Sequence, residues 1–308
     1  MTHRFPRRCS APLAFATGAL LALAVAAPNQ ANVSARGGAP QAQRGAAPQA
    51  PRATSRTIAP IDLTGYWVSV ITEDWRWRMM TPPKGDVSSV PINAEGRRVA
   101  DTWDLAKDEA TGNACKPFGV GSIMRMPGRL HITWQDDNTL KLDLDAGTQT
   151  RLLHFGGKAP ADGERTWQGY STAEWEVAGQ QLDVDRNGIP VLGGGGGGGG
   201  GGGRGGRGRG GLPRGGSLKV STANFREGYL RKNGVPYSSD AAISEYFDRV
   251  GPEPNGDTFL IVRTLIEYPK YLQLPFITST HFKLEREGSK WNPTPCRIDP
   301  PAVGSGSR

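Results

Sequence analysis

The sequence predicts an all-β fold: an antiparallel barrel of about ten strands with one short helix. Short runs of residues alternate apolar and polar side chains, and turn-forming residues separate these runs. Helical segments do not recur between the runs, which argues against a parallel sheet with crossover helices. A β-sandwich is the alternative, because the same short strands can form either architecture.

The first expected strand covers residues 63–71, with Trp67 on its apolar face. Residues 75–79 continue the alternation and are also interpreted as extended chain. The single predicted helix begins after Asn93, whose side chain can cap a helix N-terminus. Val99 and Trp103 are four residues apart, as expected on one helix face.

The clearest hairpin joins residues 130–134 to residues 140–144, because Leu and Ile alternate with polar residues on both sides of an Asp-Asp-Asn turn. Ala178-Gly179 is expected to form a hairpin turn between two later strands, and Asn233-Gly234 is another turn signal. The further strands are expected at residues 149–155, 166–177, 181–185, 218–222, 243–250, 258–267 and 277–285.

Residues 1–26 are interpreted as a signal peptide. Arginines precede an apolar run that is short for a membrane span, and an Ala-Val-Ala motif predicts cleavage between Ala26 and Ala27. A membrane anchor is the alternative. The favoured interpretation predicts a periplasmic or secreted protein whose mature form has no membrane span.

Two segments carry too little apolar side chain to offset the entropy of ordering them. Residues 27–60 are expected to be a disordered tether of Ala, Pro, Gly and Arg, and residues 193–216 a disordered Gly/Arg-rich insertion. The insertion interrupts a single β domain expected over residues 61–308. The chain has a net charge of +8, but its excess of basic residues lies in these segments. We therefore expect no specific nucleic-acid binding by the folded domain.

Cys115 and Cys296 are the cysteines that remain after the predicted cleavage. Two cysteines in an exported chain favour a disulfide, although two unpaired buried thiols are the alternative. They lack the close spacing of zinc ligands, so no metal site is predicted from them.

Gly65-Tyr66-Trp67 matches the G-x-W pattern of lipocalin-like barrels. Further blocks follow at residues 167–171, 175–176, 182–185, 233–238, 245–249 and 268–271. Their order resembles a family of uncharacterised secreted proteins of soil bacteria, acidobacteria among them. The resemblance covers most of residues 62–285 and implies a barrel, export and a structural role for Trp67 at one end. Tyr237 and Tyr246 depart from the family pattern, which has His and Arg there.

Aromatic and charged residues on expected inward faces predict a site for a small apolar or amphipathic ligand, bound without a cofactor. Aromatic rings would give affinity, and a charged pair of Glu245 and Arg249 would orient the ligand. Core packing is the alternative role for the aromatic residues, and a surface ion pair is the alternative for the charged ones. The candidate ligand-binding residues are Trp134, Trp167, Trp175, Glu245, Phe247 and Arg249.

Catalytic motifs are weak. His131, His154 and His281 are scattered over three expected strands without metal-ligand spacing. Ser171 lies in an alternating strand, whereas a nucleophile elbow needs a sharp strand-to-helix turn. An extracytoplasmic enzyme with carboxylates or histidines at the barrel mouth remains an alternative to the binding protein. A surface or scaffold protein that acts through its Arg-Gly segments is a further alternative.

Overall fold

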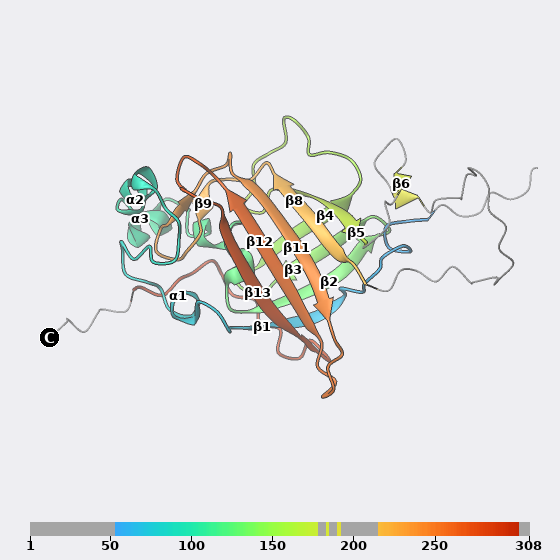
Figure 1. The fold of residues 1–308 in the computed structure, drawn as a ribbon. Coiled ribbons are helices and arrows are strands. Elements are labelled where there is room, and N and C mark those ends of the chain that lie inside the picture. Colours follow the sequence, from blue (N-terminus) through green and yellow to red (C-terminus); the bar gives the residue numbers. More distant parts are fainter. Residues whose placement is uncertain (1–52, 178–182, 185–189, 192–214, 302–308) are drawn as a thin grey trace, which may run out of the picture. The chain divides into compact units, whose positions relative to one another are not determined.

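The computed structural model describes residues 53–177, 183–184, 190–191 and 215–301. Nine strands close a barrel in the order β1-β13-β12-β11-β8-β5-β4-β3-β2, which confirms the predicted fold class (Figure 1). All neighbouring pairs are antiparallel except β4 and β5, which are parallel. The barrel strands are β1 (Gly65–Val70), β2 (Arg129–Asp136), β3 (Thr139–Leu144), β4 (Gln149–Phe155), β5 (Tyr170–Glu176), β8 (Ser217–Ala223), β11 (Ala242–Val250), β12 (Phe259–Glu267) and β13 (Phe276–Glu285).

Every helix that the structure describes lies in the long connection between β1 and β2. They are α1 (Trp75–Met79), α2 (Ala94–Ala100), α3 (Leu105–Ala110), η1 (Lys116–Phe118) and η2 (Ile123–Arg125). The α2 helix begins where the sequence predicts, because the Asn93 side chain accepts a hydrogen bond from the Gly96 N–H at 2.9 Å. Two short pairs complete the described elements: β6 (Asp183–Val184) with β7 (Pro190–Val191), and β9 (Gly228–Tyr229) with β10 (Pro236–Tyr237).

Residues 75–79 form α1, so the prediction of extended chain there is wrong. Asp74 adopts a left-handed backbone conformation with φ of 50°, which turns the chain after β1. The helix then directs Arg78 into the interior. Alternation over five residues is too short a pattern to distinguish a strand from a single helical turn.

The second strand of the parallel pair, β5, has a different antiparallel partner from the one expected. β5 pairs with β8, whereas the sequence predicted a hairpin with residues 181–185. The predicted turn at Ala178-Gly179 lies outside the described residues. The short strand β6 pairs with β7, as noted above.

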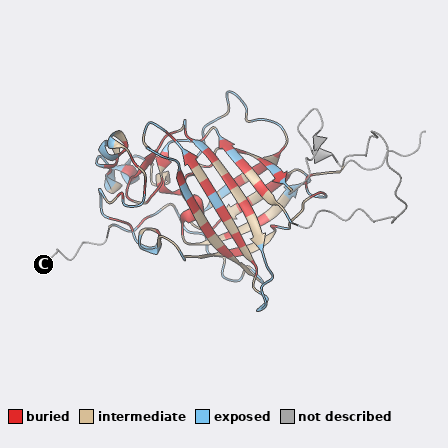
Figure 2. Ribbon diagram, viewed as in Figure 1, coloured by how far each residue is buried: buried red, intermediate tan, exposed pale blue. Residues whose placement is uncertain are grey.

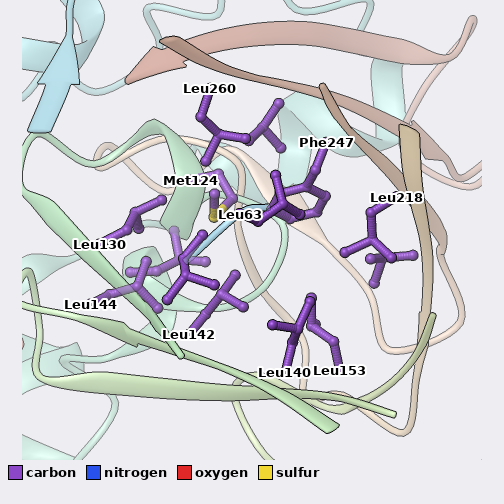
Figure 3. Packing of buried hydrophobic residues seen from close by; sticks show 14 of the residues in the cluster. Leu63, Met124, Leu130, Leu140, Leu142, Leu144, Leu153, Leu218, Phe247 and Leu260 are labelled. Carbon is purple, nitrogen blue, oxygen red and sulfur yellow. The ribbon is translucent and has the colours of Figure 1, made fainter. Parts of the chain in front are cut away.

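Apolar and polar residues alternate along the strands, and the apolar face of each strand is buried in the barrel core (Figure 2). Leucines from opposite sides converge in the interior together with Phe247 (Figure 3). Trp67 is also fully buried in this core, and its indole N–H donates to the Leu63 carbonyl at 2.9 Å. Apolar side chains therefore occupy this part of the barrel interior.

Residues before β1 cover the end of the barrel at which β1 begins. Ile58 packs into the barrel core, and the Trp175 indole N–H donates to the Ser55 carbonyl at 2.9 Å. Phe155 lies against both Trp134 and Trp175, with ring centroids 5.6 and 5.2 Å away. The packed part of the chain thus begins before residue 61, within the segment expected to be a tether.

The predicted disulfide is confirmed. Cys115, just before η1, is bonded to Cys296 in the segment after β13, with their Cα atoms 5.0 Å apart. The bond ties the connection that carries the helices to the C-terminal part of the chain.

Candidate functional site

At the end of the barrel beside the helices, several inward positions are polar. Arg151 of β4 is 1 % exposed and Glu245 of β11 is 0 % exposed. The Arg151 Nη1 and Nη2 atoms donate to the two Glu245 carboxylate oxygens at 3.1 and 2.5 Å. Ser171 and Thr222 lie beside this pair, and their hydroxyl oxygens are 2.8 Å apart. These four residues form a buried polar layer.

The expected pair of Glu245 and Arg249 is not formed. Arg249 lies toward the opposite end of the barrel, where its guanidinium is 3.8 Å from an Asp62 carboxylate oxygen. Strand residues rise about 3.3 Å each, so two inward positions four residues apart are separated by about 13 Å. Glu245 instead pairs across the interior with Arg151, which the sequence analysis did not single out.

Tyr237 of β10 packs above the polar layer. Its side chain is 1 % exposed and packs in a second apolar cluster, with the Phe225 ring centroid 5.9 Å away. The Tyr237 ring packs closely against Gly228. A Cβ at position 228 would lie 2.6 Å from the Tyr237 hydroxyl oxygen, so a larger residue there would clash with the ring. Burial raises the pKa of the Tyr237 phenol, so the hydroxyl stays protonated.

A cleft of about 240 Å³ opens above Tyr237, beside α3 and the β9–β10 hairpin. Its walls combine aromatic rings with charged side chains. The aromatic residues are Trp103, Tyr229, Tyr237 and Tyr271, the charged ones are Asp104, Lys107, Asp108, Lys116 and Glu227, and the others are Val99, Thr102, Gly228, Gly234 and Pro236.

Three of the cleft residues are bonded to one another. The Tyr229 hydroxyl donates to Asp108 at 2.7 Å, and the Lys116 ammonium lies 3.5 Å from the other oxygen of that carboxylate. Burial and the Asp108 hydrogen bond raise the pKa of Tyr229, so this phenol is neutral. Within the described ranges, no ion pair engages the side chains of Lys107 or Glu227. These two charges are available to a bound molecule.

The structure brings only three of the six predicted ligand-binding residues together, in the packed barrel core. Trp134 and Trp175 lie at the covered end, and Phe247 lies in the barrel core. Trp167 precedes β5 and is half-buried under Arg226, whose guanidinium is 4.0 Å from the ring centroid. None of these residues lines the cleft.

The cleft residues were missed because they come from short helices, short strands and loops that are far apart in the sequence. Trp103 was predicted to lie on a helix face with Val99, but α2 ends at Ala100, so Trp103 lies beyond the helix. Tyr271 belongs to one of the blocks that carry the family resemblance, and Tyr229 lies four residues before the Asn233-Gly234 turn signal. Spacing along a chain does not show which loops meet at one end of a barrel.

His131, His154 and His281 lie on three different strands, β2, β4 and β13. His131 stacks on Tyr66 and His154 on Tyr170, with centroids 3.9 and 4.5 Å apart, and burial lowers the pKa of both imidazoles. His281 Nδ1 lies 2.8 Å from the Thr72 hydroxyl. Among the residues that the structure describes, no three metal-ligating side chains gather at one point.

Comparisons with protein-family models, with curated proteins and with solved structures found no match. The resemblance to a family of secreted barrel proteins therefore remains a prediction. In the part of the chain that the structure describes, no helix has the length and apolar character needed to cross a membrane.

Proposed function

We propose that this chain is an exported protein that binds a small amphipathic molecule in the cleft beside α3 and the β9–β10 hairpin. The observation that carries the proposal is the combination of four aromatic rings with unpaired charges in one hollow of about 240 Å³. Ligand sites typically combine apolar walls with a few polar groups that fix orientation.

The charges of the cleft favour a ligand with a cationic amine. Asp108 and Lys116 neutralise each other, which leaves Asp104 and Glu227 against Lys107. The remaining charge is therefore negative. An amine would contact the Glu227 carboxylate, while an attached apolar group would pack against Trp103 and the tyrosines. Aromatic faces also attract cations directly.

The size of the cleft sets the size of the ligand. Sites for drug-sized molecules typically measure roughly 300–1,000 Å³. A cleft of about 240 Å³ lies just below that range and suits a molecule the size of an amino acid or a small aryl amine.

The export proposed here agrees with the disulfide, since such bonds persist in oxidising compartments.

Calorimetric titration with phenethylamine tests the proposal. Glu227→Gln removes the charge that would bind the amine, and we expect affinity to fall about tenfold, the value of one charge-assisted hydrogen bond. Glu253→Gln is the matched control, because Glu253 is an exposed carboxylate in the loop between β11 and β12. The proposal fails if phenethylamine does not bind at millimolar concentration, or if both variants respond alike.

A further inference from the structure

Three buried arginines meet beneath α1. Arg78 of α1 is 2 % exposed, Arg125 of η2 is 7 % exposed and Arg231, in the turn between β9 and β10, is 3 % exposed. Arginine is rarely buried unless its charge is paired and its donors are bonded. Three such side chains in one place therefore need acceptors.

Two of the three arginines have a carboxylate partner. Arg78 forms an ion pair with Glu73, and its Nε donates to the Arg125 carbonyl at 3.0 Å. Arg125 Nη2 donates to an Asp74 carboxylate oxygen at 2.6 Å. The second terminal nitrogen of Arg78, Nη2, has no acceptor among the described residues.

Among the residues that the structure describes, Arg231 has no carboxylate partner within ion-pair distance. None of its three guanidinium nitrogens donates to any residue that the structure describes. Its flat face instead lies over the Trp77 ring, 4.8 Å from the centroid. Burial, followed by repulsion from Arg125, lowers the pKa of Arg231 to about 10, while Asp74 and Asp86 act in the opposite direction. The side chain is still charged at neutral pH.

A small void adjoins these groups. It has a volume of about 10 Å³, close to the room that one water molecule requires, and its lining includes Trp77, Arg78, Arg125, Arg231 and Lys232. Four cations therefore surround a space near four carboxylates, those of Glu73, Asp74, Asp86 and Asp299. Among the described residues, none accepts a hydrogen bond from the Arg231 guanidinium.

We propose that this arginine cluster binds the carboxylate group of a small organic anion. A planar carboxylate presents two parallel acceptors to a guanidinium fork, which matches the donors left open on Arg231 and Arg78. A carboxylate brings one negative charge to these donors, whereas a tetrahedral dianion would bring a second one near four carboxylates.

Access to the cluster depends on Trp77. Its ring covers Arg231, and its indole N–H donates to an Asp86 carboxylate oxygen at 3.1 Å. A carboxylate reaches the guanidinium only when this ring shifts, so α1 is the element that must move. The site differs in chemistry from the cleft, because its open groups are guanidinium donors whereas the cleft carries a negative excess.

The test is a thermal-melting titration with sodium acetate at constant ionic strength, with sodium chloride and sodium sulfate in parallel. At about a hundredfold excess over Kd, acetate should raise Tm by about 5–10 °C relative to chloride. Sulfate stabilises folded proteins in general, so its shift should be the same in the wild type and in Arg231→Met. Equal shifts with acetate and chloride would overturn the proposal.

Substitutions test whether the rise in Tm with acetate comes from binding at Arg231. Arg231→Met should abolish the response to acetate, and Arg231→Lys, which keeps the charge but loses the fork, should weaken acetate binding at least tenfold. Arg98→Met is the matched control, since the Arg98 side chain is 67 % exposed in an ion pair with Glu95, and it should leave the response unchanged. Without added carboxylate, Arg231→Met should melt no lower than the wild type. A lower Tm, or an acetate response that survives this substitution, would refute the site.

Discussion

Glu245→Gln tests the energetic account of the buried polar layer. The substitution keeps the shape of the side chain and removes its charge, so that Arg151 becomes an unpaired cation with 0 % side-chain exposure. One of the two acceptor oxygens becomes an NH₂ group that faces a guanidinium donor. Water cannot replace the lost oxygen without a rearrangement of the barrel interior.

The expected cost follows from the two hydrogen bonds at 3.1 and 2.5 Å. Breaking a buried ion pair by removing one partner typically costs about 3–5 kcal/mol, because the other charge is left uncompensated. With a urea m-value of about 2 kcal/mol/M, the unfolding midpoint should fall by about 2 M. Ser171 and Thr222 can offset little of this loss, since each lies 3.5 Å from Arg151 Nη2.

Urea unfolding followed by circular dichroism measures the effect. Glu174→Gln is the matched control, because Glu174 pairs with Lys219 on the barrel surface and is 62 % exposed; it should change stability by less than about 1 kcal/mol. The double substitution Arg151→Met with Glu245→Leu should recover most of the loss, because apolar replacement of a whole buried pair is often neutral. A loss below about 1 kcal/mol for Glu245→Gln, or a double variant less stable than the single one, would refute the reasoning.

Two further predictions concern the disulfide and pH. Replacing Cys115 and Cys296 with Ser should lower the free energy of unfolding by about 5 kcal/mol, because the bond joins residues 181 positions apart; an unchanged Tm would contradict this. Lowering the pH from about 7.5 to about 5.5 should destabilise the fold through His131 and His154: burial lowers the pKa of both, so the unfolded chain takes up protons first, near pH 6.5. The double variant His131→Gln with His154→Gln should show a smaller change in urea midpoint over this range, and an equal change would exclude the two histidines as its source.

Much of the barrel could be predicted from the sequence because each strand buries one face. Residues 140–144 place Leu at every second position, and in the structure these leucines all point inward. The predicted range 149–155 coincides with β4. A period of two is a local property, so it can be seen without knowing which strands are neighbours.

Strand pairing could not be predicted in the same way. A turn signal at Ala178-Gly179 favours a hairpin with the next residues, because consecutive strands usually pair. β5 instead pairs with β8, which begins at Ser217, beyond the Gly-rich segment. The free energy that selects this partner comes from inward contacts such as Trp175 with the barrel core, and these depend on the closed order of all nine strands.

The candidate sites were harder to predict for the same reason. Arg151 and Glu245 are 94 residues apart in sequence, and only the strand order brings them together. The expected partner, Arg249, could have been excluded from strand geometry alone, since four residues of extended chain separate two side chains by about 13 Å. In the described part of the chain, no residue accepts a hydrogen bond from the Arg231 guanidinium. This depends on how several segments pack together, and no sequence pattern indicates it.

The polar layer explains why both proposed sites lie in the loops beside the helices. A ligand inside the barrel would have to displace packed leucines or separate Arg151 from Glu245, and either change costs several kcal/mol. The cleft and the arginine cluster require neither, because the first is already open and the second needs only a movement of Trp77. Both sites also take residues from the β9–β10 hairpin, Tyr229 in one and Arg231 in the other. In both proposals the barrel supports this hairpin against the helices, and the proposed binding chemistry resides in the segments outside the barrel strands.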